Sequence, residues 1–316
     1  MPTHPSAAPV GGRTGGLLDR PYLILVLTVA FWGGNVVAGK AAVGHIDPYA
    51  LMILRWTGAF LFVLPFALRY LRRDLPVLKA NWWLLAIYGG LGFATFNMLV
   101  YIAAYFTSGV NNALDQVTVN IFVMGLNFLI FRTRVKLLQL VGVAISIMGV
   151  AVTATHGDLT RILALDINFG DLLVIIACFA YAIYSLLLRY RPPTHWLSFL
   201  TTTVAAAALA SVLFQAFVGG GLASFIAAVP GITPLGWLIV AYTVLFPSLI
   251  SQFFYVRGVE LIGANRASLF INLIPFFGAL GSVLILGERL EGFHFAAGGL
   301  IIIGIVLAEW SARRSA

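Results

Sequence analysis

The stretch YIAAYFTSGVNNA, Tyr101–Ala113, has a weaker copy in the second half of the chain, YVRGVELIGANRA, Tyr255–Ala267. An earlier pair of segments, AFWGGNVVAGK (Ala30–Lys40) and FAYAIYSLLLR (Phe179–Arg189), matches in the same order. The aligned positions are Trp32/Tyr181, Asn35/Tyr184, Lys40/Arg189, Gly109/Gly263, Asn111/Asn265, Thr118/Asn272 and Phe122/Phe276. Their shared order and spacing predict a duplicated fold, with residues 22–155 as the first repeat and 171–310 as the second.

Composition indicates that both repeats lie in a membrane. Of the 316 residues, 61% are hydrophobic and 9% are charged, whereas soluble domains carry about 25% charged residues. Ten apolar segments are long enough to cross about 30 Å of hydrocarbon, and only helices satisfy their backbone in lipid at these lengths. They are 22–43, 49–70, 82–106, 112–131, 137–155, 171–190, 195–217, 235–257, 266–286 and 293–310. We therefore predict an all-α polytopic bundle of ten transmembrane helices.

The basic residues indicate the orientation of these helices. With a cytoplasmic N-terminus, fifteen of the nineteen Lys and Arg fall on the cytoplasmic side, three fall outside, and Arg55 lies within the second span. We therefore predict that both termini are cytoplasmic, with residues 1–21 a disordered tail and not a signal peptide, and 311–316 a second tail. The net charge of +8 belongs to this loop pattern, and no basic patch interleaved with aromatic residues suggests a nucleic-acid partner.

Each predicted repeat holds an odd number of helices, so equivalent helices must cross the membrane in opposite directions. Inverted repeats of this kind are a recurrent architecture of secondary transporters, which hold their substrate near the bilayer midplane where the repeats meet. The predicted fold is thus two inverted five-helix repeats around a central cavity, in contact with the lipid bilayer.

Several motifs resemble those of EamA-type members of the drug/metabolite transporter superfamily. They are Trp32-Gly33, Pro48 followed by Arg55, the Tyr-x-x-Ala-x-x-x-x-Gly pattern before the fourth span, and Pro275 followed by Gly287-Glu288-Arg289. The resemblance covers residues 22–310 and implies the same ten-helix architecture, in a bacterial inner membrane. Phe131-Arg132-Thr133 departs from it, because many relatives carry a Gly-Glu-Arg type element there. The aromatic and amide content looks most like that of bacterial amino-acid exporters with broad or aromatic specificity.

The fourth span carries polar side chains that lipid would penalise. Asn112, Gln116, Asn120 and Asn127 share one broad helix face. Buried amides also tie helices together, a role that we favour for Asn127, whereas the cluster from Asp115 to Asn120 predicts a cavity wall. The predicted substrate-binding residues are Trp32, Asn35, Asn97, Tyr101, Asp115, Gln116, Thr118, Asn120, Tyr181, Tyr184, Ser185, Gln252, Tyr255 and Asn272. For Tyr181 and Tyr184, helix packing is an equal alternative to cavity lining.

Asp115 has several possible partners, namely a substrate amine, Arg55 or Lys40, and a proton-relay role is open as well as a structural ion pair. Pro247 and Pro275 lie inside predicted spans, where proline frees a backbone carbonyl and kinks a helix. We interpret both as hinges for alternating access. Gly287-Glu288-Arg289 is interpreted as a helix end with a charge pair that stabilises a gate.

These features favour a secondary transporter that exports small metabolites, most simply aromatic and other neutral amino acids. Multidrug or other metabolite efflux is the alternative, and an intramembrane enzyme on lipid-linked substrates or a receptor is more remote. The sequence contains no H-E-x-x-H motif, no aspartate-rich diphosphate site and no P-loop. We therefore expect no catalytic residues, metal, cofactor or ATP-binding site. The scarcity of buried acids favours facilitated diffusion, or proton transfer by Asp115 alone.

Overall fold

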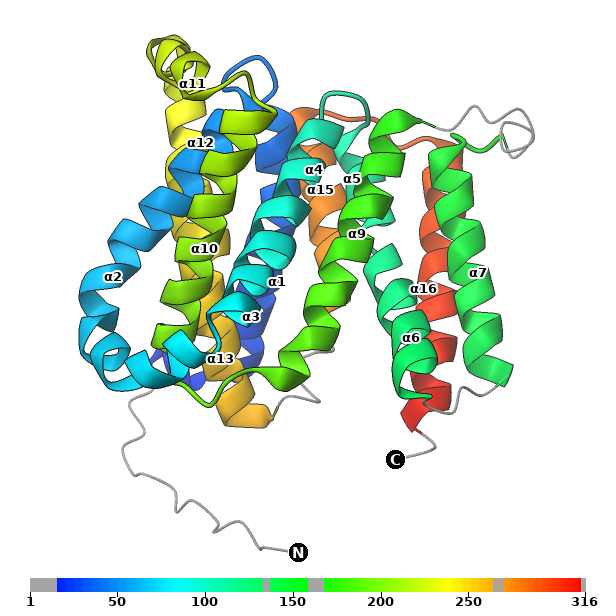
Figure 1. Ribbon diagram of the computed structural model, residues 1–316. Helices are drawn as coiled ribbons and strands as arrows, with labels where there is room; N and C mark the ends of the chain where they lie inside the picture. The colour runs from blue at the N-terminus through cyan, green and yellow to red at the C-terminus, as the bar shows by residue number, and fades with distance from the viewer. Residues whose placement is uncertain (1–15, 133–136, 159–167, 264–266, 268–269, 314–316) are drawn as a thin grey trace, which may run out of the picture.

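The computed structural model describes residues 16–132, 137–158, 168–263, 267 and 270–313, which are helical apart from short connections (Figure 1). The α-helices are α1 (Pro21–Ala41), α2 (Pro48–Ala80), α3 (Trp82–Ile87), α4 (Phe96–Ala103), α5 (Gly109–Asp115), α6 (Thr118–Phe131), α7 (Leu137–Ala154), α9 (Phe169–Leu187), α10 (Trp196–Phe217), α11 (Leu222–Ala228), α12 (Pro234–Leu245), α13 (Ser251–Ile262), α15 (Ile274–Leu286) and α16 (Gly292–Arg313). Two π-helical segments, η2 (Tyr88–Thr95) and η5 (Phe246–Ile250), join α3 to α4 and α12 to α13. Three 3₁₀ turns cover Leu17–Asp19, Leu188–Tyr190 and Val229–Gly231.

Seven helical segments in the described residues are long and apolar enough to cross a membrane. They are Pro21–Ala41, Pro48–Ala80, Trp82–Ala103, Gly109–Phe131, Phe169–Tyr190, Trp196–Phe217 and Pro234–Ile262. Leu137–Thr153, Leu222–Gly231, Ile274–Leu286 and Gly292–Gly304 are shorter apolar helices. Large apolar side chains such as Leu129, Phe217 and Leu284 lie exposed on the outside of the bundle, which suits a lipid environment. The predicted all-helical membrane class is therefore confirmed, while the count of ten crossings stays a prediction.

Helices from the two halves of the chain alternate in the bundle. α2 packs against α10 and α12, and α7 packs against α16. Between these pairs, α1 contacts α13 and α15, while α9 contacts α4 and α6 (Figure 1). The first residue of α1 and the last residue of α16 lie at the same end of the bundle. We call the opposite end, which holds the α4–α5 connection and the start of α9, the far end.

Close backbone contacts fix the positions of the central helices. A Cβ atom on Gly33 of α1 would lie 2.7 Å from the backbone nitrogen of Gly278 in α15, so only glycine permits this approach of the two helices. A Cβ on Gly89 of η2 would lie 2.3 Å from the carbonyl oxygen of Thr203 in α10. Small residues thus bring helices of the two halves together, as they do in membrane bundles generally.

Three predicted spans differ from the observed helices. α2 continues past residue 70 to Ala80, because the charged residues that end an apolar span do not end a helix. The fourth span is broken, since α5 ends at Asp115 and α6 begins at Thr118. The ninth span, predicted as a kinked helix over 266–286, has a turn at residues 272–273, and α15 begins after it with Pro275 in its first turn. Proline is favourable there because the first turn needs no backbone N–H.

Candidate functional site

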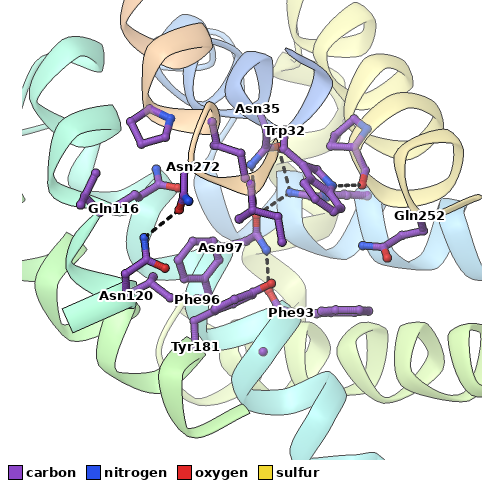
Figure 2. Close-up of a pocket in the computed structure, with 18 of the residues that line it drawn as sticks. Trp32, Asn35, Phe93, Phe96, Asn97, Gln116, Asn120, Tyr181, Gln252 and Asn272 are labelled. Atoms are coloured by element: carbon purple, nitrogen blue, oxygen red, sulfur yellow. Dashed lines mark hydrogen bonds between the residues drawn. The ribbon is translucent and has the colours of Figure 1, made fainter. Parts of the chain in front are cut away.

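A cavity of about 150 Å³ lies among the central helices. An engineered protein cavity of similar volume binds benzene, so this one has room for a small organic molecule. Its wall consists of Trp32, Asn35, Arg55, Trp56, Gly92, Phe93, Phe96, Asn97, Gln116, Val117, Val119, Asn120, Tyr181, Pro247, Gln252, Ile271, Asn272, Ile274 and Pro275. These residues come from α1, α2, α9 and four other spans, where they lie in or next to the π-helical segments and helix breaks (Figure 2).

Two broken helices meet at this cavity. The break after α5 brings Gln116 and Val117 into the wall, and the turn before α15 brings in Asn272. Asn120 Nδ2, on the first turn of α6, donates a hydrogen bond to Asn272 Oδ1 over 3.3 Å (Figure 2). Irregular backbone at membrane depth is tolerated where protein or a water-filled cavity satisfies it. The breaks therefore mark a polar centre inside an apolar bundle.

Both π-helical segments also contribute to the wall. η2 supplies Gly92 and Phe93, and η5 supplies Pro247. The carbonyl oxygen of Pro247 accepts a hydrogen bond from the indole nitrogen of Trp32 over 3.1 Å (Figure 2). Short π-helical insertions in α-helices are frequent at functional sites, and here each widened turn exposes backbone and side chains to the same cavity.

Arg55 is the charged group of the cavity wall, and it is 3% exposed to solvent. Its Nη1 donates to Asn35 Oδ1 over 3.0 Å and to Asn97 Oδ1 over 2.8 Å, and it also contacts the Tyr101 hydroxyl. Its Nε donates to Ser248 Oγ over 2.9 Å. These acceptors are all neutral.

In the described part of the chain no carboxylate pairs with Arg55, and its Nη2 donates no hydrogen bond. A buried positive charge is costly unless an opposite charge or several hydrogen bonds compensate it. Arg55 is thus held by dipoles alone and turned toward the cavity, which makes the cavity attractive to an anionic group.

Aromatic rings form the rest of the wall around this guanidinium. The Arg55 guanidinium carbon lies 4.4 Å from the centroid of the Trp56 ring, and Trp56 stacks on Phe93 at 5.2 Å. Phe96 and Tyr181 face each other at 4.9 Å (Figure 2). Such rings offer large apolar area and electron-rich faces, so the cavity pairs one cation with an aromatic enclosure.

Most of the predicted substrate-binding residues lie in this wall. Those that line it are Trp32, Asn35, Asn97, Gln116, Asn120, Tyr181, Gln252 and Asn272, together with both predicted hinge residues, Pro247 and Pro275. Those outside the wall are Tyr101, Asp115, Thr118, Tyr184, Ser185 and Tyr255. Their roles in binding, like those of the wall residues, stay predictions.

Several residues outside the wall support it from behind. The Tyr101 hydroxyl donates to Asn35 Oδ1 over 2.7 Å while it contacts Arg55. Tyr184 packs on Phe93 at 5.8 Å, so of the predicted tyrosine pair Tyr181 lines the cavity and Tyr184 packs behind it. Tyr255 packs against Trp32 at 5.6 Å.

The two protein partners predicted for Asp115, Arg55 and Lys40, were wrong, while a substrate amine stays a prediction. Asp115 is completely buried and interacts with the carboxyl group of Asp171, near the start of α9, and not with Arg55 or Lys40. Lys40 Nζ donates instead to the carbonyl oxygens of Ala104 and Thr107, over 2.8 and 2.7 Å. Asp171 is the first residue of the predicted span 171–190, next to a loop, yet it is also completely buried.

Glu288 binds a helix end at the far end of the bundle. Its two carboxylate oxygens accept hydrogen bonds from the backbone nitrogens of Gly109 and Val110, over 2.7 and 2.9 Å. An acid at a helix N-terminus satisfies free N–H groups and the helix dipole. Glu288 therefore joins the segment between α15 and α16 to the start of α5.

Sequence reasoning missed Arg55, Trp56, Phe93 and Phe96 as cavity residues. Arg55 had a usable signal, because an ionisable residue inside a membrane span is a functional candidate by default. The aromatic residues had none, since rings in an apolar helix face lipid, core or cavity with the same local sequence. Only the packing of the helices separates these cases.

An apolar helical bundle that encloses a polar and aromatic cavity between broken helices is an architecture typical of membrane transporters. A model of the EamA-like transporter family matches residues 20–155 and again 168–310. The chain belongs to this family, which confirms the resemblance read from its motifs.

Relatives with similar full-length sequences are named as transporters. The uncharacterized transporter YyaM of Bacillus subtilis (strain 168) is 25% identical, with 91% of this chain and 93% of the relative covered. An uncharacterized transporter of Archaeoglobus fulgidus is 28% identical, with 91% and 98% covered. A solved crystal structure that is 18% identical covers 93% of this chain and 98% of its own, with a TM-score of 0.60, and so shares the fold.

Proposed function

We propose that the chain is a secondary transporter of two inverted repeats that moves small carboxylate-bearing metabolites, most simply neutral and aromatic amino acids, out of the cell by alternating access. The termini lie in the cytoplasm of a bacterial cell, and the far end faces outward across the inner membrane. The observation that carries the substrate class is Arg55, a buried guanidinium in the cavity wall whose Nη2 bonds to no described protein group.

Helix contacts support the repeat architecture. If α1 is equivalent to α9, α4 to α13, and α5–α6 to the span that ends in α15, then the α1–α15 contact mirrors α9–α6, and α1–α13 mirrors α9–α4. The α2–α10 and α7–α16 contacts are their own mirror images. The two family matches and the π-helical segments, one in each half, follow the same division.

The rest of the wall fits the other parts of an amino acid. A carboxylate would accept hydrogen bonds from Arg55, a geometry that guanidinium groups favour. The amide oxygens of Gln116, Asn120 and Gln252 are suitable acceptors for an ammonium group. The apolar side chain would lie among Phe93, Phe96 and Tyr181. The single positive charge disfavours purely cationic drugs, which makes multidrug efflux the weaker alternative.

Counterflow in liposomes tests this assignment. Purified protein is reconstituted with unlabelled phenylalanine inside, and uptake of labelled phenylalanine, phenylalaninamide and phenethylamine is compared with protein-free vesicles. We expect phenylalanine to exchange, and the two compounds without a carboxylate to exchange at least about tenfold more slowly, because they leave the Arg55 charge unpaired. Equal exchange of all three would refute the carboxylate assignment, and exchange of cationic drugs alone would favour the alternative.

A further inference from the structure

A second polar centre lies apart from the cavity wall, between α5 and α9. The side chains of Asp115 and Asp171 are both completely buried and interact directly. Asp171 Oδ1 accepts a hydrogen bond from the Thr107 hydroxyl. Neither oxygen of Asp115, nor Oδ2 of Asp171, accepts a hydrogen bond from an N–H or O–H group of the described residues.

This pattern of unpaired oxygens indicates a proton. Two carboxylates in contact and out of water cannot both be ionised, as in aspartic proteases, where two such groups share one proton. When one acid is protonated, its O–H donates to the other, and the unpaired oxygens face a partner. Because the two buried carboxyl groups interact with each other, a proton fits between them, whereas a metal cation would need several more oxygen ligands.

We propose that Asp115 and Asp171 form a proton-binding site that couples transport to the proton gradient. The pair joins the two halves of the chain, and Asp115 directly precedes Gln116 in the cavity wall. With the proton bound, α5 and α9 are held together at the far end. When the proton leaves, two buried carboxylates repel each other and the contact opens. One proton moves inward for each substrate molecule that moves outward.

Other ionisable groups surround the pair from each packed element. They are Cys178 on α9, His156 after α7, His294 on α16, Glu288 and Glu291 between α15 and α16, and Lys40 on α1. Lys40 reaches the backbone of Thr107, and none of the described groups forms an ion pair with either acid. His294 Nδ1 accepts from the Glu291 backbone over 2.8 Å, and its Nε2 lies 3.1 Å from Asn111 Oδ1.

This arrangement suggests where the proton enters. With Nδ1 used as an acceptor, the proton of neutral His294 is on Nε2 and points to Asn111, whose side chain faces Asp171. A proton from the far end can therefore reach the two aspartates through His294 and Asn111. On the other side of the pair, Gln116 connects Asp115 to the cavity.

Infrared spectroscopy tests the proton site without any substrate. A protonated carboxyl group has a C=O stretch that shifts in D₂O. We expect this band in reconstituted wild type at neutral pH, its loss in the double variant Asp115→Asn/Asp171→Asn, and no change in Glu260→Gln, which removes an exposed acid that pairs with Arg257. A band that is absent from wild type, or retained in the double variant, would overturn the proposal whatever the substrate is.

The coupling step rests on the transport function proposed above, and it is measured separately. With the membrane potential clamped at zero, one proton per substrate predicts about a tenfold accumulation for each unit of pH difference. We expect this accumulation in wild type and Glu260→Gln and its loss in both asparagine variants, while Asp171→Asn keeps substrate–substrate exchange and so remains folded. Wild-type accumulation that ignores the pH difference, or variants that still respond to it, would contradict coupling. Accumulation driven by a sodium gradient, and not by a proton gradient, would show that the pair binds a metal cation and would overturn the proposal.

Discussion

Asn120 and Asn272 join two broken helices across the cavity through a hydrogen bond of 3.3 Å. In the alignment of the two halves, Asn272 corresponds to Thr118, which lies two residues before Asn120 on α6. Each amide thus lies beside the break of its own helix and contacts the corresponding region of the other half. Relative movement of the two halves must change this contact.

This contact should be measurable in a double-mutant cycle. Asn120→Ala and Asn272→Ala each remove one partner, and the double variant removes both. We expect the two changes to be non-additive by about 0.6 kcal/mol in the free energy of unfolding in mixed micelles, the typical worth of a hydrogen bond between membrane helices. Additive effects would show that the two amides act independently. Asn127→Ala serves as the control, because the Asn127 side chain bonds within its own helix and its effect should add to that of Asn272→Ala.

Arg55 should dominate substrate affinity. Arg55→Gln removes the charge, and we expect the half-saturating concentration of a carboxylate substrate in counterflow to rise about 30-fold or more. Arg55→Lys keeps the charge and loses the planar guanidinium, so its affinity for the substrate should lie between those of the wild type and Arg55→Gln. Arg257→Gln is the matched control, because Arg257 pairs with exposed Asp19 and Glu260. An Arg55→Gln protein with unchanged affinity would remove Arg55 from the binding site.

Tyr101 should act through Arg55 and not through the substrate. Tyr101→Phe removes the hydroxyl that contacts Arg55 and Asn35 and keeps the buried ring. We expect a loss of affinity of about fivefold, in line with one hydrogen bond of about 1 kcal/mol, and no further loss in the Arg55→Gln background. Tyr105→Phe, which removes a long 3.4 Å contact at an exposed ring, should leave affinity unchanged. Independent losses from Tyr101→Phe and Arg55→Gln would argue for direct contact with substrate.

Two neighbouring glycines should respond differently to alanine. At Gly89 the new Cβ would meet the backbone of Thr203 at 2.3 Å, whereas at Gly90 it would meet nothing within 4 Å. We expect Gly89→Ala to lower the thermal midpoint in detergent by an amount that corresponds to about 1–3 kcal/mol of overpacking. Gly90→Ala should match wild type within error. Equal behaviour of the two variants would show that η2 and α10 can separate without cost.

His195, just before α10, should resist protonation. Burial is the main cause that lowers the pKa of this imidazole, and nearby Arg73 lowers it further. Its ring stacks on Tyr70 at 3.7 Å. Because the unfolded chain binds this proton more readily than the folded chain, the contribution of His195 to stability falls as the pH drops through the ordinary histidine range. Imidazole signals in NMR should show one residue, absent in His195→Gln, that titrates below the usual value.

The helices themselves were predictable, because long apolar segments have no other stable structure in lipid. The position of the cavity was also predictable in part, since polar side chains in such segments must face an interior, and Gln116, Asn120 and Asn272 do so. The break after Asp115 was not, because the local sequence contains neither proline nor glycine there. The contacts of the break lie in the other half of the chain, where Asp115 meets Asp171 and Cys178.

Charge inside the spans was the least predictable feature. Asp171 lies at the boundary between a loop and a span, and its sequence neighbours fit either an exposed or a buried position. Arg55 was placed within the second span, but its sequence neighbours do not show whether it faces a cavity or a partner on another helix. In both cases the burial arises from contacts between residues more than forty positions apart, such as Arg55 with Asn97 and Asp171 with Thr107.

The two π-helical segments make the cavity sensitive to chain length as well as to side-chain chemistry. A π-helical turn contains about one residue more than an α-helical turn. Each residue rotates an α-helix by about 100° about its axis. Asn97 follows η2 and Gln252 follows η5, and both face the cavity. Deleting Leu249 or Ile250 from η5 would leave the composition of α13 intact and rotate Gln252 toward a neighbouring helix or the lipid. A single-codon deletion there would therefore change what the cavity recognises without replacing any residue in its wall.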